Sequence, residues 1–255
     1  MVFNSTEIKY SEIKNYSEED TLGITGTNFN LNKFIYFNLF ISVILILLGL
    51  IAGLISLEQG SQLTSDRLLY RFVKLFNLNL EANIPAWYSG FLMIMISGLS
   101  LYIAKIKSLP LRKYFLSISI IFLFMSIDEI SSIHEILNNP VRTLFNFGSL
   151  FYWAWIFPAL VFLIILAFAF RQFFMMIDKK FGKLFLLSGV VYLMGVIGFE
   201  MLGGWLYSNK LGNSYYYVIE VVVEESLEMV GLWLFIYALI EYLKSFVDEV
   251  RIGIQ

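Results

Sequence analysis

The sequence has no cysteine, one histidine and few charged residues for its length. Of its 255 residues, 15% are charged. The absence of cysteine excludes disulfides, thiolate metal ligands and cysteine nucleophiles. A single histidine excludes bis-histidine haem ligation and the His-Glu-x-x-His zinc motif. Soluble domains carry roughly 25% charged residues, so much of this surface must face something other than water.

Several functional motifs are also missing. The net charge is −2 and no dense cluster of Lys and Arg occurs, so no nucleic-acid partner is expected. Phosphate-binding loops, dinucleotide fingerprints and Gly-x-Ser-x-Gly elbows are absent. No lysine lies in the middle of a hydrophobic segment, which excludes a retinal Schiff base.

Long hydrophobic runs dominate the sequence, and 58% of its residues are hydrophobic. A helix needs roughly 20 mostly apolar residues to cross a bilayer. Six segments qualify: 34–57, 87–104, 114–136, 148–170, 184–207 and 215–242. Strands of a membrane barrel alternate in polarity, whereas these runs are continuous. We therefore predict an all-α fold, a polytopic transmembrane helical bundle of six spans.

The hydrophobic runs leave no room for a separate soluble core. We predict a polar cytoplasmic tail at 1–33, a transmembrane domain at 34–244 and a short cytoplasmic tail at 245–255. The first tail lacks the basic start and small-residue cleavage site of a secretory signal peptide.

The distribution of basic residues predicts the orientation. Most of the 18 Lys and Arg fall on the side that also holds both termini. The positive-inside rule then places both termini in the cytoplasm. We expect the chain in a plasma membrane, the inner membrane of a bacterium. Trp87, Trp155 and Trp205 fall at ends assigned to the outside, as an aromatic belt would. The bilayer is the expected partner, and self-association stays open.

The pattern of basic and apolar residues at 66–76 predicts a further amphipathic helix between the first two spans. Basic residues share one of its faces and apolar residues the other. We expect this helix to lie flat in the outer interface, with Ser65 or Asp66 as its cap.

Charged residues inside spans cost at least about 2.5 kcal/mol each on insertion scales, so they usually mark function. Spans three, five and six carry such residues, all in the outer half under the predicted topology. The predicted proton- or ion-binding residues are Asp128, Glu129, His134, Glu135, Glu200, Glu224 and Glu228. Helical spacing places Asp128, Ser132 and Glu135 on one face of span three, and Glu220, Glu224 and Glu228 on one face of span six.

The spans contain no Lys or Arg except at their cytoplasmic ends, so these carboxylates need another source of positive charge. Protons shared among carboxyl groups are one source. A divalent cation is the other: oxygen ligands suit Ca²⁺, Mg²⁺ or Mn²⁺, and one imidazole admits Zn²⁺ or iron. The expected metal ligands are Asp128, Glu135, Glu224 and Glu228. No Glu-x-x-His pair is present, which disfavours a helical di-iron centre.

Other interpretations stay open for individual residues. His134 fits a hydrogen-bonded interfacial histidine as well as a ligand or an acid/base group, and Glu200 fits a helix-to-helix hydrogen bond. Glu225 fits a pair at a dimer contact. Glu81 and Asn83, which precede span two, are placed to reach the acidic residues from the outer loop.

Three short motifs resemble those of a group of uncharacterised bacterial polytopic membrane proteins. They are Ser126-x-Asp128-Glu129-x4-His134-Glu135, Glu81-x-Asn83-x-Pro85-x-Trp87 and Glu224-x3-Glu228. The resemblance implies a shared fold and supplies no activity. Membrane hydrolases related to alkaline ceramidases gather several histidines around zinc, and the single histidine here departs from that pattern.

The sequence favours transport or channel activity around an outward-facing site for a proton or divalent cation. A metal-dependent membrane enzyme acting on a lipid or another outer-leaflet substrate is the alternative. A membrane sensor or scaffold whose partner binds the amino-terminal tail is a further one. Whether the chain is an enzyme stays open.

Overall fold

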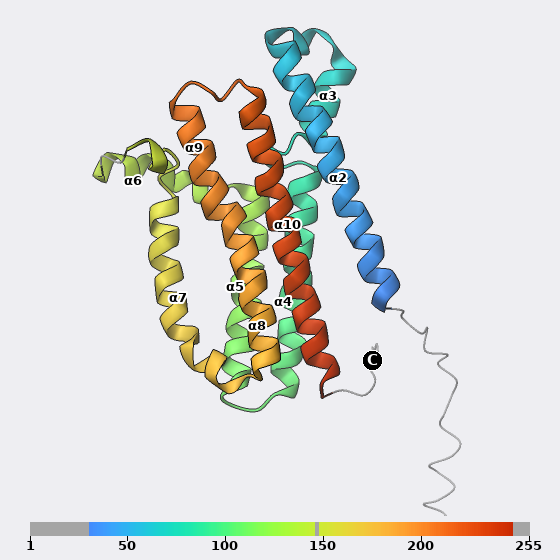
Figure 1. The fold of residues 1–255 in the computed structure, drawn as a ribbon, viewed down its shortest axis with the longest axis vertical. Helices are drawn as coiled ribbons and strands as arrows, with labels where there is room; N and C mark the ends of the chain where they lie inside the picture. Colours follow the sequence, from blue (N-terminus) through green and yellow to red (C-terminus); the bar gives the residue numbers. More distant parts are fainter. Residues whose placement is uncertain (1–30, 146–147, 247–255) are drawn as a thin grey trace, which may run out of the picture.

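The structure, a computed structural model, describes residues 31–145 and 148–246 as a helical bundle (Figure 1). No strand occurs within those two ranges. The helices that make up the predicted spans are α2 (Leu31–Gln59), α4 (Ile84–Ile106), α5 (Leu111–Ser131), α7 (Ile156–Met176), α8 (Lys179–Leu193), α9 (Glu200–Ser208) and α10 (Tyr215–Lys244). Of the predicted tails, residues 1–30 and 247–255 lie outside the described residues.

The remaining elements are short. Helix α3 (Arg67–Phe76) and α6 (Asn138–Leu144) lie in connections, together with the 3₁₀ turns Gly60–Ser65, His134–Leu137 and Ser149–Phe151. A π-helical segment, η4 (Met194–Phe199), joins α8 to α9 in one continuous span.

The prediction of six spans is confirmed. Six helices are long and apolar enough to cross a membrane: Phe34–Ser65, Ile84–Ile106, Leu111–Ser131, Ile156–Met176, Lys179–Ser208 and Tyr215–Lys244. Helix α7 shows the membrane character clearly, because large apolar side chains such as Phe162, Ile165 and Phe168 are exposed along it. An isolated apolar helix face of this kind is expected to contact lipid.

Several predicted boundaries differ from the structure. Span four ends at Met176 and not at 170, and span five begins at Lys179 and not at 184. Span three ends at Ser131 and not at 136, because Ser132 adopts a left-handed conformation (φ 52°) that terminates α5. Span four begins at Ile156 and not at 148, because the aromatic segment before it forms a 3₁₀ turn that packs on α9. Composition alone does not separate an apolar turn from an apolar helix.

The predicted amphipathic helix is present as α3, and its cap is Asp66, whose carboxylate accepts hydrogen bonds from the backbone N–H groups of Leu68 and Leu69. The apolar face of α3 packs against the end of α2, where Val73 is buried with Ala52. This packing accounts for its apolar face without requiring that the helix lie flat on lipid. The basic face, which carries Arg67, Arg71 and Lys74, is exposed.

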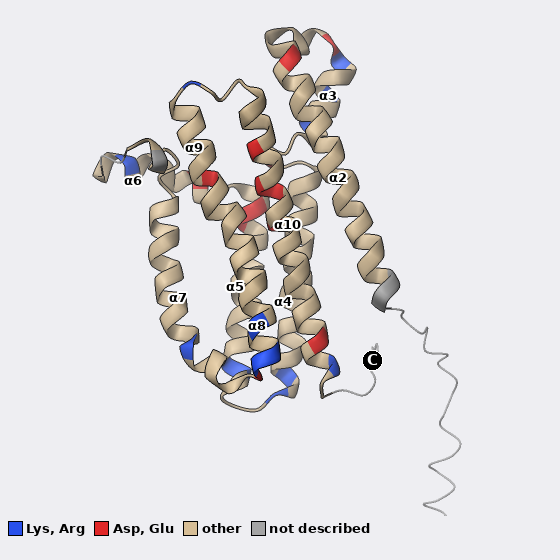
Figure 2. Ribbon diagram, in the orientation of Figure 1, with Lys and Arg blue, Asp and Glu red and all other residues tan. Residues whose placement is uncertain are grey.

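Helix α10 lies in the middle of the bundle and packs against α2, α4, α8 and α9 (Figure 1). The fully buried apolar core, including Phe115, Ile236 and Leu239, lies toward the end where α10 finishes. Figure 2 shows Lys and Arg gathered at that same end and several acidic residues within the opposite part of the bundle. We call these the basic end and the acidic end.

Glycines allow α10 to approach its neighbour closely. At Gly231 a Cβ atom would lie 2.6 Å from the backbone nitrogen of Tyr192 and 2.7 Å from its Cα. Backbone atoms cannot rotate away as a flexible side chain can. The contact between α8 and α10 therefore depends on the missing side chain.

We predict that Gly231→Ala lowers the stability of the folded protein by about 1–3 kcal/mol, because the added methyl group overpacks this contact. The measurement is the thermal unfolding midpoint in detergent. Gly189→Ala is the matched control, since a Cβ atom there meets nothing within 4 Å. Equal midpoints for the two variants would contradict the close approach.

Candidate functional site

The end of α5 positions His134 through Asp128. After the left-handed Ser132, the chain turns back so that the Asp128 carboxylate accepts a hydrogen bond from the backbone N–H of His134 (2.8 Å). Its second oxygen lies 3.0 Å from Nδ1 of His134. An ionised carboxylate accepts but does not donate, so Nδ1 carries a proton, and in the neutral imidazole Nε2 keeps its lone pair.

Glu81 approaches His134 from the loop between α3 and α4. Its Oε1 lies 3.6 Å from Nε2 of His134. Asn83 holds this loop: its side-chain oxygen caps α4 at Ala86, and its amide nitrogen donates to the backbone oxygens of Asn77 and Leu80. Asn83 therefore positions Glu81, and its polar atoms do not face the acidic residues.

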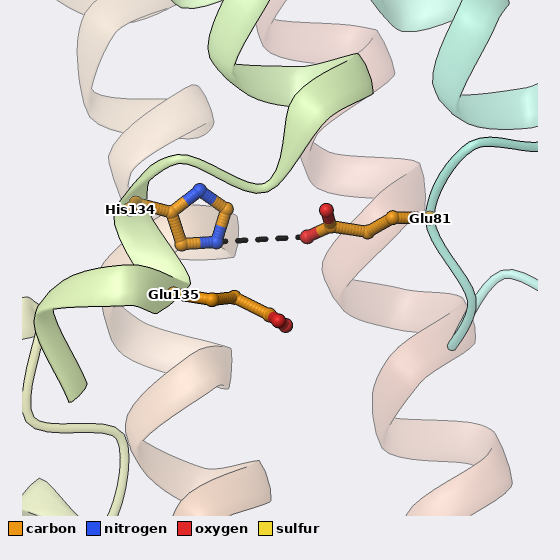
Figure 3. A group of neighbouring side chains, drawn as sticks. All are labelled: Glu81, His134 and Glu135. Atoms are coloured by element: carbon orange, nitrogen blue, oxygen red, sulfur yellow. Dashed lines mark ion pairs between the residues drawn. The ribbon is translucent and has the colours of Figure 1, made fainter. Parts of the chain in front are cut away.

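Glu135 completes a group of three with Glu81 and His134. One ligand atom from each lies within 4.8 Å of the others. Figure 3 shows the three side chains extending into the same space between the two connecting segments. Glu135 is exposed, whereas Glu81 and His134 are partly buried, with 32% and 23% of their side chains accessible.

Trp155 links this group to span five. Its ring lies against the imidazole of His134, with centroids 4.6 Å apart, and its indole N–H donates to Oε1 of Glu200 at 3.1 Å. From the sequence, Trp155 is predicted only as an interface anchor. No local motif identifies the role of Trp155, because its partners His134 and Glu200 are distant from it in the chain.

Helix α10 supplies a row of four glutamates: Glu220, Glu224, Glu225 and Glu228. Glu220 and Glu228 are buried, with 4% and 8% of their surface accessible. Along a helix that rises about 1.5 Å per residue, the row extends over roughly 12 Å. It thus leads from the start of α10 toward the apolar core.

Two glycines of span five fit against this row. A Cβ atom at Gly203 would lie 2.9 Å from both carboxylate oxygens of Glu220, and one at Gly195 would lie 2.8 Å from Cγ of Glu228. Gly195 belongs to the π-helical segment η4, which directly precedes Glu200. Such segments are frequent at functional sites, because they redirect the residues that follow.

The acidic residues of the separate spans interact with one another. Glu224 interacts electrostatically with Glu200 and with its neighbours on α10. Glu228 interacts with Glu225, Glu129 and Glu81. Direct contacts join Asp128 to His134, His134 to Glu81, and Trp155 to both His134 and Glu200. The predicted residues Asp128, Glu129, His134, Glu135, Glu200, Glu224 and Glu228 lie on α5, the turn after it, α9 and α10, and Glu220 and Glu225 belong to the same α10 row. We call this set, with Glu81, the carboxylate cluster.

Two predicted arrangements differ from the structure. Asp128, Ser132 and Glu135 do not share a helix face, because α5 ends before Ser132. The predicted metal ligands also do not form one set. The three residues whose ligand atoms are within mutual reach, Glu81, His134 and Glu135, share only Glu135 with the predicted four.

No Lys or Arg forms an ion pair with the cluster in the part of the chain that the structure describes. The described ion pairs join His134 to Glu81 and Asp128, and Lys244 to Glu241 at the basic end. Both carboxylate oxygens of Glu220, Oε2 of Glu81 and Oε2 of Glu225 are buried, and none of them has a hydrogen-bond partner within residues 31–145 and 148–246. These oxygens lack the donors that buried acceptors ordinarily have.

Burial raises the pKa of Glu81 to about 7 from its ordinary 4.5. That net value also includes the charge of His134, which lowers the pKa, and the charges of Glu135 and Asp128, which raise it. For His134, burial lowers the pKa, but the hydrogen bond and charge of Asp128 outweigh burial, and the net shift is upward. The pKa of each of the two facing groups is therefore above its ordinary value.

We predict that Glu81→Gln stabilises the protein at about pH 8.5 by on the order of 2 kcal/mol and has little effect at about pH 5. The native Glu81 stays protonated up to about pH 7 while an unfolded chain ionises it near 4.5, so stability falls as pH rises through that window. Thermal unfolding midpoints in detergent with a chelator measure this effect. Glu58→Gln, at the exposed end of α2, is the control. A gain that is equal at both pH values would contradict the assignment.

The comparisons with known proteins are consistent with an uncharacterised family and supply no activity. Neither the curated proteins nor the solved structures contain a match to the chain. Residues 39–242 match a family described as Domain of unknown function (DUF8692). That match includes four complete spans, most of α2, nearly all of α10 and the whole carboxylate cluster. The chain belongs to this family.

Proposed function

We propose that the chain binds protons or divalent cations in the carboxylate cluster as a step in ion transport across its membrane. The observation that carries the proposal is the meeting of acidic side chains from spans three, five and six without a basic partner among the described residues. Carboxylates at such a depth need compensating charge.

A structural role explains the cluster less well. Buried carboxyl groups used only for packing would be hydrogen-bonded, because leaving them unsatisfied costs stability. Glu220 is buried and neither of its oxygens has a partner. A bound cation or proton from solution supplies what the protein side chains do not.

Access to the cluster differs between its two sides. Glu81 and His134 are partly exposed at the acidic end, whereas the core around Met229 and Ile236 is closed toward the basic end. Ions would enter at the acidic end. Passage across the bundle would require the apolar core to open, as in alternating access.

We further propose that the basic end faces the cytoplasm of a plasma membrane. The beginning of α2 and the end of α10 point the same way as the connections that carry most of the described Lys and Arg (Figures 1 and 2). The positive-inside rule then puts both termini in the cytoplasm and the cluster near the outer surface.

Single cysteines test this orientation, because the native chain has none. We expect a membrane-impermeant maleimide to label Asn213→Cys in intact cells and to leave Ser108→Cys unlabelled until the cells are opened. Both positions are exposed, one between α9 and α10 and the other between α4 and α5. Labelling with the opposite preference would overturn the assigned orientation.

A metal-dependent membrane enzyme is the second candidate, and the Asp128–His134 pair beside two carboxylates favours it. An ion held there would activate water for attack on an outer-leaflet substrate. This function would need a tightly held metal and no ion flux. The sensor alternative rests on residues 1–30, which lie outside the described part of the chain.

Transport is tested by reconstitution of the purified protein into liposomes. We expect proton or Mn²⁺ flux above that of protein-free liposomes, and we expect Glu224→Gln to reduce it roughly tenfold or more, because the change removes a charge that interacts with Glu200 and Glu228. The probes are a pH-sensitive dye and a fluorophore quenched by Mn²⁺.

Glu241→Gln is the matched control for this experiment. Glu241 belongs to the same helix, but it lies at the basic end and pairs with Lys244. Its variant should keep wild-type flux. Equal flux in wild type and Glu224→Gln, or no flux in wild type, would contradict the proposal.

A further inference from the structure

Asp128 holds the ring of His134 so that its other nitrogen, Nε2, faces Glu81. Asp128 accepts hydrogen bonds from both the backbone N–H and the Nδ1 side of His134 (2.8 and 3.0 Å). The other nitrogen, Nε2, faces Oε1 of Glu81 at 3.6 Å. Metal-bound histidines commonly have this arrangement, in which a carboxylate orients the ring through its second nitrogen.

Glu81 and Glu135 lie close enough to Nε2 to bind the same ion. The three ligand atoms lie within 4.8 Å of one another. Ligands bound tetrahedrally at about 2.0–2.1 Å are roughly 3.4 Å apart, so no pair in the group must approach by more than about 1.4 Å. Nε2 of His134 and Oε1 of Glu81 are already 3.6 Å apart, and the exposed side chain of Glu135 can supply the rest of the adjustment.

Unpaired carboxylate oxygens provide an independent indication that a cation binds here. Oε2 of Glu81 is buried and has no hydrogen-bond partner. Glu225 interacts electrostatically with Glu81 and also has an unpaired buried oxygen. Farther along the same row, Glu220 is 4% exposed and both of its oxygens are unpaired. Carboxyl oxygens without a hydrogen-bond partner among the described residues thus extend from the three-residue group along α10.

The ligand types indicate the class of ion. One imidazole nitrogen and two carboxylates suit divalent first-row metals such as Mn²⁺, Fe²⁺, Co²⁺ and Zn²⁺. Ca²⁺ and Mg²⁺ prefer oxygen-only sites, with at least six ligands or several retained waters. Three protein ligands leave at least one coordination position open.

We propose that Glu81, His134 and Glu135 bind a divalent first-row transition-metal ion, with Asp128 as the residue that positions the imidazole. The inference deepens the proposed function and rests on it in one respect: the ion bound at the mouth of the cluster is the ion that is transported. Trp155 covers one face of His134 and donates to Glu200, so it connects the metal group with span five.

The test is a titration of the detergent-purified full chain with Co²⁺ after chelator treatment, followed by visible absorption. We expect one ion per chain with bands typical of nitrogen and oxygen ligands. His134→Gln, Glu81→Gln and Glu135→Gln should each weaken binding roughly tenfold or more, and Asp128→Asn by roughly 10–100-fold. A positioning role for Asp128 predicts weaker binding with the band positions retained, which a general loss of folding would not give.

Glu58→Gln is the control and should bind Co²⁺ as the wild type does, because it lies outside the group at the exposed end of α2. Glu135 is itself exposed, so its variant is expected to fold even if His134→Gln does not. Wild-type affinity in Glu135→Gln, or no Co²⁺ binding by the wild type, would overturn the inference. Binding without flux would contradict transport alone, and flux without binding would contradict this metal group alone.

Discussion

The central constraint in this protein is the cost of placing ionisable carboxyl groups inside an apolar bundle. Insertion of one charged residue near the centre of a span costs at least about 2.5 kcal/mol, and spans three, five and six carry several. Within the described ranges the basic residues lie elsewhere, and the one histidine is already paired with Asp128. The fold can keep these groups together only if something from solution balances their charge.

The rest of the architecture is consistent with that constraint. Gly195 and Gly203 remove side chains where span five meets α10, which makes space for the carboxyl groups of Glu228 and Glu220. The apolar core toward the basic end keeps water away from the other side of the cluster. The left-handed Ser132 ends α5 and directs His134 back over the cluster. Packing, backbone conformation and polar contacts thus favour the same site.

The sequence was sufficient to predict the elements that depend on composition and periodicity. Continuous apolar runs predict six spans, and the pattern of residues 66–76 predicts the apolar face of α3 with Ser65 or Asp66 as its cap. The depth of the carboxylates predicts that Glu200 and Glu224 lie close together. The end of α5 was misplaced, because a single left-handed serine leaves no trace in hydrophobicity.

Other parts of the site depend on contacts between distant segments. Trp155 meets His134 and Glu200 only after spans four and five pack, and no spacing along the chain indicates that meeting. The sequence also does not predict that Asn83 holds the loop before α4, because its amide nitrogen donates to backbone oxygens, which every residue type has. Sequence patterns predict which residues could carry chemistry, and tertiary structure is needed to show which of them contact one another.

The most direct test of this account is an experimental density map of the protein in a lipid bilayer at neutral pH. The account predicts that the carboxyl groups of Glu200, Glu224 and Glu228 surround a common volume, and that density for an ion or ordered water lies among the cluster and His134. Side chains directed toward lipid, or each paired with its own donor in the protein, would contradict it.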